Sequence, residues 1–111
     1  MSTRPFAVVR EAEIAQRAYI QSDTATTSSS GSNYWTLTIK KNNSTTIFTK
    51  TTNGAEIAQW GAYDLGAYAS LAAAKVSAGT PLQFTMTATG SPTDLTGANI
   101  TVTVETTKDL G

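Results

Sequence analysis

Carboxylates are the side chains of this sequence whose type and spacing come nearest to catalytic chemistry. The chain contains no histidine and no cysteine, which excludes Ser-His-Asp and Cys-His catalysis and metal sites built from those residues. Glu11 and Glu13 would share one face of an extended strand, roughly 7 Å apart, a separation that suits an inverting glycosidase. Because any acidic i, i+2 pair on a strand has this spacing, we interpret the two as a solvated strand edge and predict no enzyme and no cofactor.

Asp94 lies in a turn-like segment, Gly-Ser-Pro-Thr-Asp-Leu-Thr-Gly at 90–97. A carboxylate in such a loop can serve as a calcium ligand, since hard cations take carboxylate and backbone oxygens. An Asp in a turn also accepts hydrogen bonds from its own backbone. We predict the turn role and no metal site. Phosphate-binding loops of the GxxxxGK[ST] or GxGxxG type are absent from the sequence.

Three aromatic residues, Trp60, Tyr63 and Tyr68, cluster in the glycine-rich stretch 54–68. Aromatic side chains anchor protein interfaces and stack on sugars, so the cluster is a candidate contact surface. The same residues could instead cap the open end of the sandwich core, which is the interpretation we prefer for the cluster. Trp60 favours the surface interpretation, because no strand pattern around it would bury its side chain.

Composition and charge exclude several classes of protein. The 8 basic and 8 acidic residues balance, whereas a nucleic-acid-binding protein needs a basic stripe to neutralise phosphates. No run of roughly 18 apolar residues is present to span a membrane. Charges at Arg10, Glu11 and Glu13 interrupt the N-terminal segment, which therefore does not resemble a Sec-type signal peptide. We expect no nucleic-acid partner and no membrane partner.

Alternation of apolar and polar residues predicts an all-β fold. Residues 82–106 contain two alternating strands around a proline-marked turn, which we interpret as an antiparallel pair. Residues 34–41 and 45–50 form a predicted hairpin, since the Asn42-Asn43 pair between them tolerates positive φ. Residues 12–22 fit a strand better than a helix. Residues 67–78 fit either a helical turn or an edge strand.

These strands predict a single-domain antiparallel β-sandwich, jelly-roll-like, over residues 12–111, preceded by an N-terminal arm at 1–11. The polar loop 23–33 has too few apolar residues to pack, so we expect it to be mobile or ordered by a partner. Alternation places eight residues in the predicted core: Trp35, Leu37, Ile39, Phe84, Met86, Ile100, Val102 and Val104.

Three segments resemble capsid decoration (cement) proteins of tailed phages, which have a jelly-roll β-sandwich. They are NYWTLTIKK at 33–41, VSAGTPLQFTMT at 76–87 and GSPTDLTGANITVTVE at 90–105. The resemblance covers about half of the chain, and its C-terminal part best. It implies a virion protein on the capsid surface, made in the host cytoplasm, that binds the major capsid protein as a homotrimer without catalysis.

On this resemblance, we expect the arm Met1 to Val9 and the loop 54–68 to contact the capsid lattice. The predicted contact residues are Arg4, Phe6, Trp60, Tyr63 and Tyr68. The alternative is a glycan- or receptor-binding module of a phage fibre or tail, because a β-sandwich with exposed aromatic residues is a common platform for sugar rings.

Overall fold

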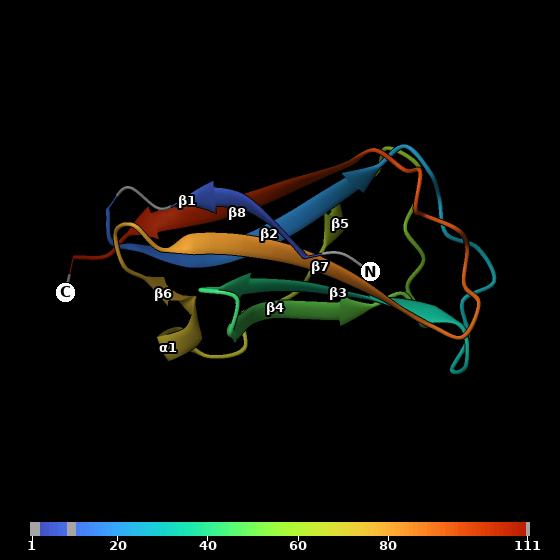
Figure 1. The fold of residues 1–111 in the computed structure, drawn as a ribbon, viewed down its shortest axis with the longest axis horizontal. Helices are drawn as coiled ribbons and strands as arrows, with labels where there is room; N and C mark the ends of the chain where they lie inside the picture. Colours follow the sequence, from blue (N-terminus) through green and yellow to red (C-terminus); the bar gives the residue numbers. More distant parts are fainter. Residues whose placement is uncertain (1–2, 9–10, 111) are drawn as a thin grey trace.

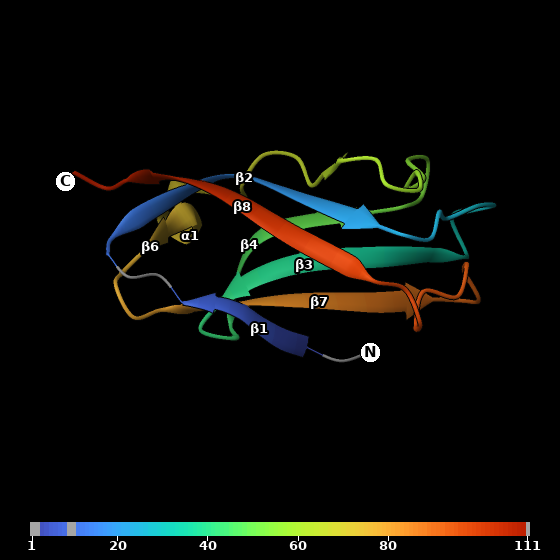
Figure 2. The same ribbon diagram turned by 90° about the horizontal axis from the view of Figure 1, so that it is seen from above.

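Two antiparallel sheets pack face to face in the structure, a computed structural model that describes residues 3–8 as backbone and residues 11–110 with their side chains. Figures 1 and 2 show the two layers from perpendicular directions, with the chain elongated along the strands. The all-β antiparallel sandwich predicted from alternation is therefore confirmed. Each sheet has four strands, the same division that a jelly roll has.

The first sheet, sheet A, has the strand order β1-β7-β3-β4. Its strands are β1 (Thr3–Val8), β7 (Pro81–Thr89), β3 (Tyr34–Lys41) and β4 (Thr45–Thr51). The predicted hairpin between β3 and β4 is confirmed: Asn42 and Asn43 have φ angles of 53° and 52°, and the Ser44 amide donates to the Lys41 carbonyl oxygen at 3.1 Å. Asn tolerates this left-handed conformation better than most residues, which closes the turn.

The second sheet, sheet B, is built around β2 (Glu13–Ser22). β8 (Ile100–Lys108) pairs along one edge of β2, and the two-residue strands β5 (Tyr63–Asp64) and β6 (Lys75–Val76) pair along the other. A single helical turn, α1 (Leu71–Ala74), precedes β6, and its N-cap Ser70 accepts a hydrogen bond from the Ala73 amide. Residues 12–22 are thus a strand, as predicted, and 67–78 contain both a helical turn and a short edge strand.

The two strands within 82–106 do not pair with each other, which corrects the predicted antiparallel pair. β7 pairs with β1 and β3 in sheet A, and β8 pairs with β2 in sheet B. The segment 90–99 crosses from one sheet to the other, as Figure 1 shows at the end of the molecule opposite α1. Leu95 is 4% exposed there, and the Trp35 indole donates to the Thr93 carbonyl oxygen at 2.7 Å. Each strand turns its apolar face to the shared core, so alternation alone does not distinguish a hairpin from a crossing.

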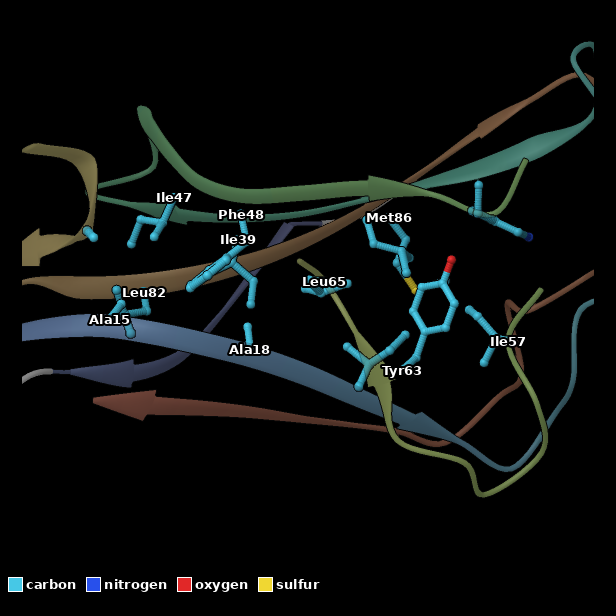
Figure 3. Close-up of a cluster of buried hydrophobic side chains, with 14 of the residues drawn as sticks. Ala15, Ala18, Ile39, Ile47, Phe48, Ile57, Tyr63, Leu65, Leu82 and Met86 are labelled. Atoms are coloured by element: carbon cyan, nitrogen blue, oxygen red, sulfur yellow. The ribbon is translucent and has the colours of Figure 1, made fainter. Parts of the chain in front are cut away.

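The core lies between the sheets and is larger than the sequence predicted. Four of the eight predicted core residues are buried, Trp35, Leu37, Ile39 and Met86. The other four are half-buried and pack against this cluster: Phe84, Ile100, Val102 and Val104. The fully buried side chains that alternation missed include Ile20, Ile47, Phe48, Ile57 and Leu65. Figure 3 shows several of these in contact across the sandwich.

A β-bulge explains two of the missed core residues. Ile39 pairs with Phe48 but Lys40 pairs with Thr46, so Ile47 is an extra residue in β4. A bulge interrupts the strict alternation of faces. Ile47 and Phe48 are consecutive in the sequence and both have 0% exposure.

Part of the expected N-terminal arm is a strand of the sandwich. Residues 3–8 form β1, which pairs antiparallel with β7 from Thr3↔Thr85 to Val8↔Pro81, with an irregularity between Pro5 and Ala7. β1 covers one edge of β7, whose other edge is taken by β3. A deletion of residues 1–9 would therefore remove a strand of sheet A together with any partner contact. Its effect on binding could not be distinguished from its effect on the fold.

The loop 23–33 is held by hydrogen bonds within the chain, unlike the expected mobile segment. The Thr26 amide donates to the Ile57 carbonyl oxygen at 2.9 Å, and the Ile57 amide donates to Thr26 Oγ1 at 2.7 Å. Thr26 is 3% exposed. The Thr27 amide also donates to Thr93 Oγ1 at 2.9 Å. Polar side chains order this loop because they form hydrogen bonds with backbone groups. A loop with few apolar residues can be held in this way.

Candidate binding surface

The predicted contact residues whose side chains are described differ widely in exposure. Trp60 is 63% exposed and is the most exposed aromatic side chain in the described part of the chain. Tyr63 is only 7% exposed, and Tyr68 is half-buried against the core. Arg4 and Phe6 lie in β1, where only the backbone is described. Of Trp60, Tyr63 and Tyr68, Trp60 is therefore the one whose side chain is exposed.

Tyr63 belongs to the core. This agrees with the interpretation that the aromatic cluster caps the core. Its hydroxyl donates to the Ala55 carbonyl oxygen at 2.6 Å and lies 3.2 Å from the Thr51 carbonyl oxygen. Figure 3 shows its ring among the core side chains. Burial, with a smaller effect of the negative charge of Glu56, raises the pKa of Tyr63. The Lys50 ammonium lies 4.6 Å from the centre of the ring, so the ring as well as the hydroxyl of Tyr63 has a partner within the chain.

Trp60 is held in a backbone conformation that is rare for a bulky residue. Its φ angle is 61°, in the left-handed region where a non-glycine side chain is strained by about 1–3 kcal/mol. The Trp60 amide donates to the Ser22 carbonyl oxygen at 2.8 Å, and the Gln21 side chain donates to the Trp60 carbonyl oxygen at 3.3 Å. The end of β2 thus fixes the backbone of this residue while its indole stays in solvent.

A hydrogen-bonded cluster around Asp23 supports the same region. Asp23 Oδ1 accepts from the Thr24 hydroxyl and from the Asn99 amide, at 3.0 and 3.1 Å, and Oδ2 accepts from the Asn99 side chain at 2.9 Å. The Gln59 side chain donates to the Asp23 carbonyl oxygen at 3.0 Å. The carboxylate of Asp23 therefore joins the end of β2 to the start of β8, and its backbone carbonyl oxygen binds the residue that precedes Trp60.

Acidification should weaken the hydrogen bonds of the Asp23 carboxylate and so lower the free energy of unfolding. The Asp23→Asn variant should lose less stability at low pH than the wild type. The Thr24 hydroxyl, then the Asn99 amide, lower the pKa of Asp23 below its usual value of 3.8. A lowered folded-state pKa means that the carboxylate stabilises the fold above pH 3.8 and loses this effect as the pH falls through the folded-state value. Urea unfolding at about pH 7 and about pH 2.5 should show a smaller acid loss of stability in the variant. Equal acid losses in both proteins would contradict this role.

An open hollow of about 370 Å³ lies on the outer face of sheet B. It is lined by Gln16, Arg17, Asp64, Gly66, Ala67 and Tyr68. Arg17 Nη1 lies 3.4 Å from the Tyr19 hydroxyl, which in turn lies 3.3 Å from Glu105 Oε1. Of the three predicted contact residues whose side chains the structure describes, Tyr68 alone lines the hollow. That these polar side chains lie together was not predictable from the sequence, because they come from two strands and a loop far apart in the chain.

The acidic residues considered for catalysis are engaged with neighbours at the end of sheet B. Glu11 Oε2 lies 4.0 Å from Lys108 Nζ, and both side chains are well exposed. Glu13 Oε1 accepts from the Thr106 hydroxyl at 3.0 Å. Glu11 precedes β2, so the two carboxylates do not share a strand face as predicted. Glu13 is half-buried in a strand that pairs with β6 on one side and with β8 on the other, so only the exposed Glu11 fits the predicted solvated edge.

Asp94 adopts the predicted turn role. Its Oδ1 accepts from the Thr96 amide at 2.9 Å and from the Thr96 hydroxyl at 2.6 Å. These hydrogen bonds, the hydroxyl first, lower the pKa of Asp94. Among residues 3–8 and 11–110, no three or more acidic side chains group together in a way that could hold a metal ion.

The comparisons with known proteins place the chain in no family. A scan against protein-family models finds no match, and searches of curated proteins and of solved structures find no similar chain. Within its described residues, the structure has no helix that is both long and apolar enough to cross a membrane. The class that the fold itself defines is an antiparallel β-sandwich with one exposed tryptophan at its loop end and one polar hollow on sheet B.

Proposed function

We propose that the chain is a decoration protein of a tailed phage, which binds the assembled icosahedral capsid through the major capsid protein and performs no catalysis. The three segments of the sequence resemblance support this proposal. In the structure they comprise β3, the turn and strand β7, and the crossing segment with β8. The resemblance thus follows the framework of the sandwich. On this proposal the chain acts as a homotrimer on the outer surface of the shell.

The observation that carries the binding role is the exposed, conformationally fixed Trp60. The backbone of Trp60 at φ 61° is strained for a bulky residue, and its 63% exposed indole is available to enter a pocket of a partner. Large aromatic residues are the commonest anchors of protein interfaces. Because hydrogen bonds from β2 hold the Trp60 backbone, little flexibility is lost when the indole enters a pocket of a partner.

A decoration protein stabilises a shell because it binds the assembled lattice and not the separated subunits. Each copy needs only a modest affinity difference between the two states, since the contact repeats over the whole shell. The balanced charge of the chain is compatible with dense packing of copies, because neighbouring molecules with no net charge do not repel each other over long distances.

Saturating amounts of the protein should raise the temperature at which undecorated, expanded capsids of the encoding phage come apart. Linkage predicts that this temperature increases with the concentration of free protein until all sites are filled. Light scattering or calorimetry of the capsids would measure it. A disruption temperature that does not respond to the protein would contradict the proposal, provided that the protein remains folded at that temperature.

A further inference from the structure

The hollow on the outer face of sheet B has features of a ligand site. Its volume of about 370 Å³ falls within the roughly 300–1,000 Å³ usual for small-molecule sites. Its lining combines charged and amide side chains with one tyrosine ring and two small residues, Gly66 and Ala67.

A β-bulge in β2 directs two polar side chains to this hollow. Ala15 pairs with Thr106 and Arg17 pairs with Glu105, so Gln16 is an extra residue in the ladder. Ala15 and Ala18 are both fully buried, while Gln16 and Arg17 between them are both exposed. Regular alternation would have placed one of the two on the core side. Bulges that re-aim side chains are common next to functional sites.

The polar groups around the hollow retain hydrogen-bonding capacity. Asp64 Oδ1 accepts from the Gly66 amide at 2.8 Å, which fixes the carboxylate and leaves its second oxygen for a ligand. The Gln16 amide nitrogen donates to Thr107 Oγ1 at 3.0 Å, which leaves its carbonyl oxygen as an acceptor. The guanidinium of Arg17 has five N–H donors and contacts the Tyr19 hydroxyl through only one of its nitrogens, at 3.4 Å.

The charges around the hollow balance. Arg17 lies in the field of Asp64 and Glu105, which raise its pKa together with the larger effect of Tyr19. The Lys50 ammonium donates to the Asp64 carbonyl oxygen at 3.0 Å and brings a second positive charge to the same strand. Lys50 and Glu105 lie outside the lining of the hollow. Among the lining residues, the positive charge of Arg17 is offset by the negative charge of Asp64. Such a site offers no net attraction to a phosphate, a sulfate or an acidic sugar.

We propose that this hollow binds a neutral carbohydrate. Donors and acceptors beside one aromatic ring are complementary to sugar hydroxyls, each of which donates and accepts, and to the apolar face of a sugar ring. Arg17 would donate to the ligand, Asp64 and Gln16 would accept from it, and Tyr68 would pack against the ring. The site is separate from Trp60, so this inference goes beyond the proposed capsid contact.

The test is an NMR titration of the labelled full-length protein with three neutral hexasaccharides, maltohexaose, cellohexaose and chitohexaose. We expect at least one to shift the resonances of Gln16, Arg17 and residues 64–68 in a saturable one-to-one manner. The Q16A/R17A variant, changed at two exposed positions, should bind that sugar at least about 10-fold more weakly. Tyr68→Ala should do the same, and Tyr34→Ala is the matched control because Tyr34 is a half-buried tyrosine of sheet A.

Several results would overturn the inference. These are no saturable shifts with any of the three sugars, shifts that map away from the hollow, or equal binding by Q16A/R17A and the wild type. Tighter binding of the acidic hexasaccharide hexagalacturonate than of every neutral one would overturn the neutral-ligand assignment. Trp60→Asn should bind the sugar like the wild type, because Trp60 does not line the hollow. Loss of capsid binding and loss of sugar binding can therefore be tested separately.

Discussion

Trp60→Asn is expected to weaken binding to undecorated capsids by at least about 100-fold, the effect of removing a central aromatic anchor. Asparagine tolerates positive φ far better than tryptophan, so the backbone at φ 61° can persist without the indole. The variant should therefore keep the wild-type free energy of unfolding or exceed it by up to about 1 kcal/mol. Sedimentation of the protein with capsids would measure binding, and urea unfolding would measure stability.

Leu71→Asn provides the matched control for this experiment. Between residues 11 and 109, Leu71 is the large apolar residue other than Trp60 that is at least half exposed, at 50%. It lies in α1, at the end of the sandwich opposite the crossing segment (Figure 1). It should bind capsids like the wild type. Undiminished capsid binding by Trp60→Asn, or equal losses in the two variants, would show that the indole is not the anchor.

Gly90→Ala is expected to lower the free energy of unfolding by about 3 kcal/mol or more. Gly90 has a φ of 68°, where an alanine is strained by about 1–2 kcal/mol. An added Cβ would also collide with the Ser32 carbonyl oxygen and approach Asn33 Oδ1 to 2.5 Å. Overpacking of this kind contributes a further 1–3 kcal/mol or so. Urea unfolding of the purified variant would measure the change.

The physical reason for the large effect is the close contact between two loops at the exit of β7. The Ser91 amide donates to Asn33 Oδ1 at 2.8 Å, and the turn that contains Asn33 is closed by hydrogen bonds between Ser30 and Asn33. Gly54→Ala is the control, since Gly54 has a φ of 77° but no atom within 4 Å of an added Cβ. It should lose only about 1 kcal/mol. Equal losses at both positions would mean that the loops do not approach each other as described.

The long strands of this fold are readable from the sequence because their faces alternate. β3 shows this best, with Trp35, Leu37 and Ile39 buried and their neighbours half exposed. The turn at Asn42 and Asn43 is readable because few other residues adopt positive φ twice in succession. Alternation carries no information about which sheet a strand joins. The predicted pairing of β7 with β8 is therefore wrong: the two strands lie in different sheets.

The parts that could not be predicted depend on irregular backbone. The bulge at Ile47 buries two consecutive residues, and the bulge at Gln16 exposes two. Both break the period on which strand prediction rests. Ile57 and Leu65 are fully buried although they lie in a segment without periodicity. Their positions follow from long-range contacts, such as the backbone hydrogen bond from Leu65 to Ala18 at 2.9 Å.

The candidate binding surface was only partly readable for the same reason. Trp60 is exposed, as the sequence suggested, although Ile57 and Leu65 in the same irregular segment are buried. Tyr63, three residues later, enters the core because β5 pairs with β2 and turns its ring inward. The hollow beside Tyr68 was not predicted, since it requires both the bulge in β2 and the placement of β5 beside it.

Counting the copies bound to a capsid tests the central claim most directly. Purified protein would be sedimented with expanded, undecorated capsids of the encoding phage, and bound copies would be counted per major capsid protein. The capsid-binding proposal predicts saturation at a fixed ratio set by the repeating lattice, with the Trp60→Asn variant left in the supernatant. No binding, or a few copies per particle at a single vertex, would contradict it and would assign the chain to a fibre or tail.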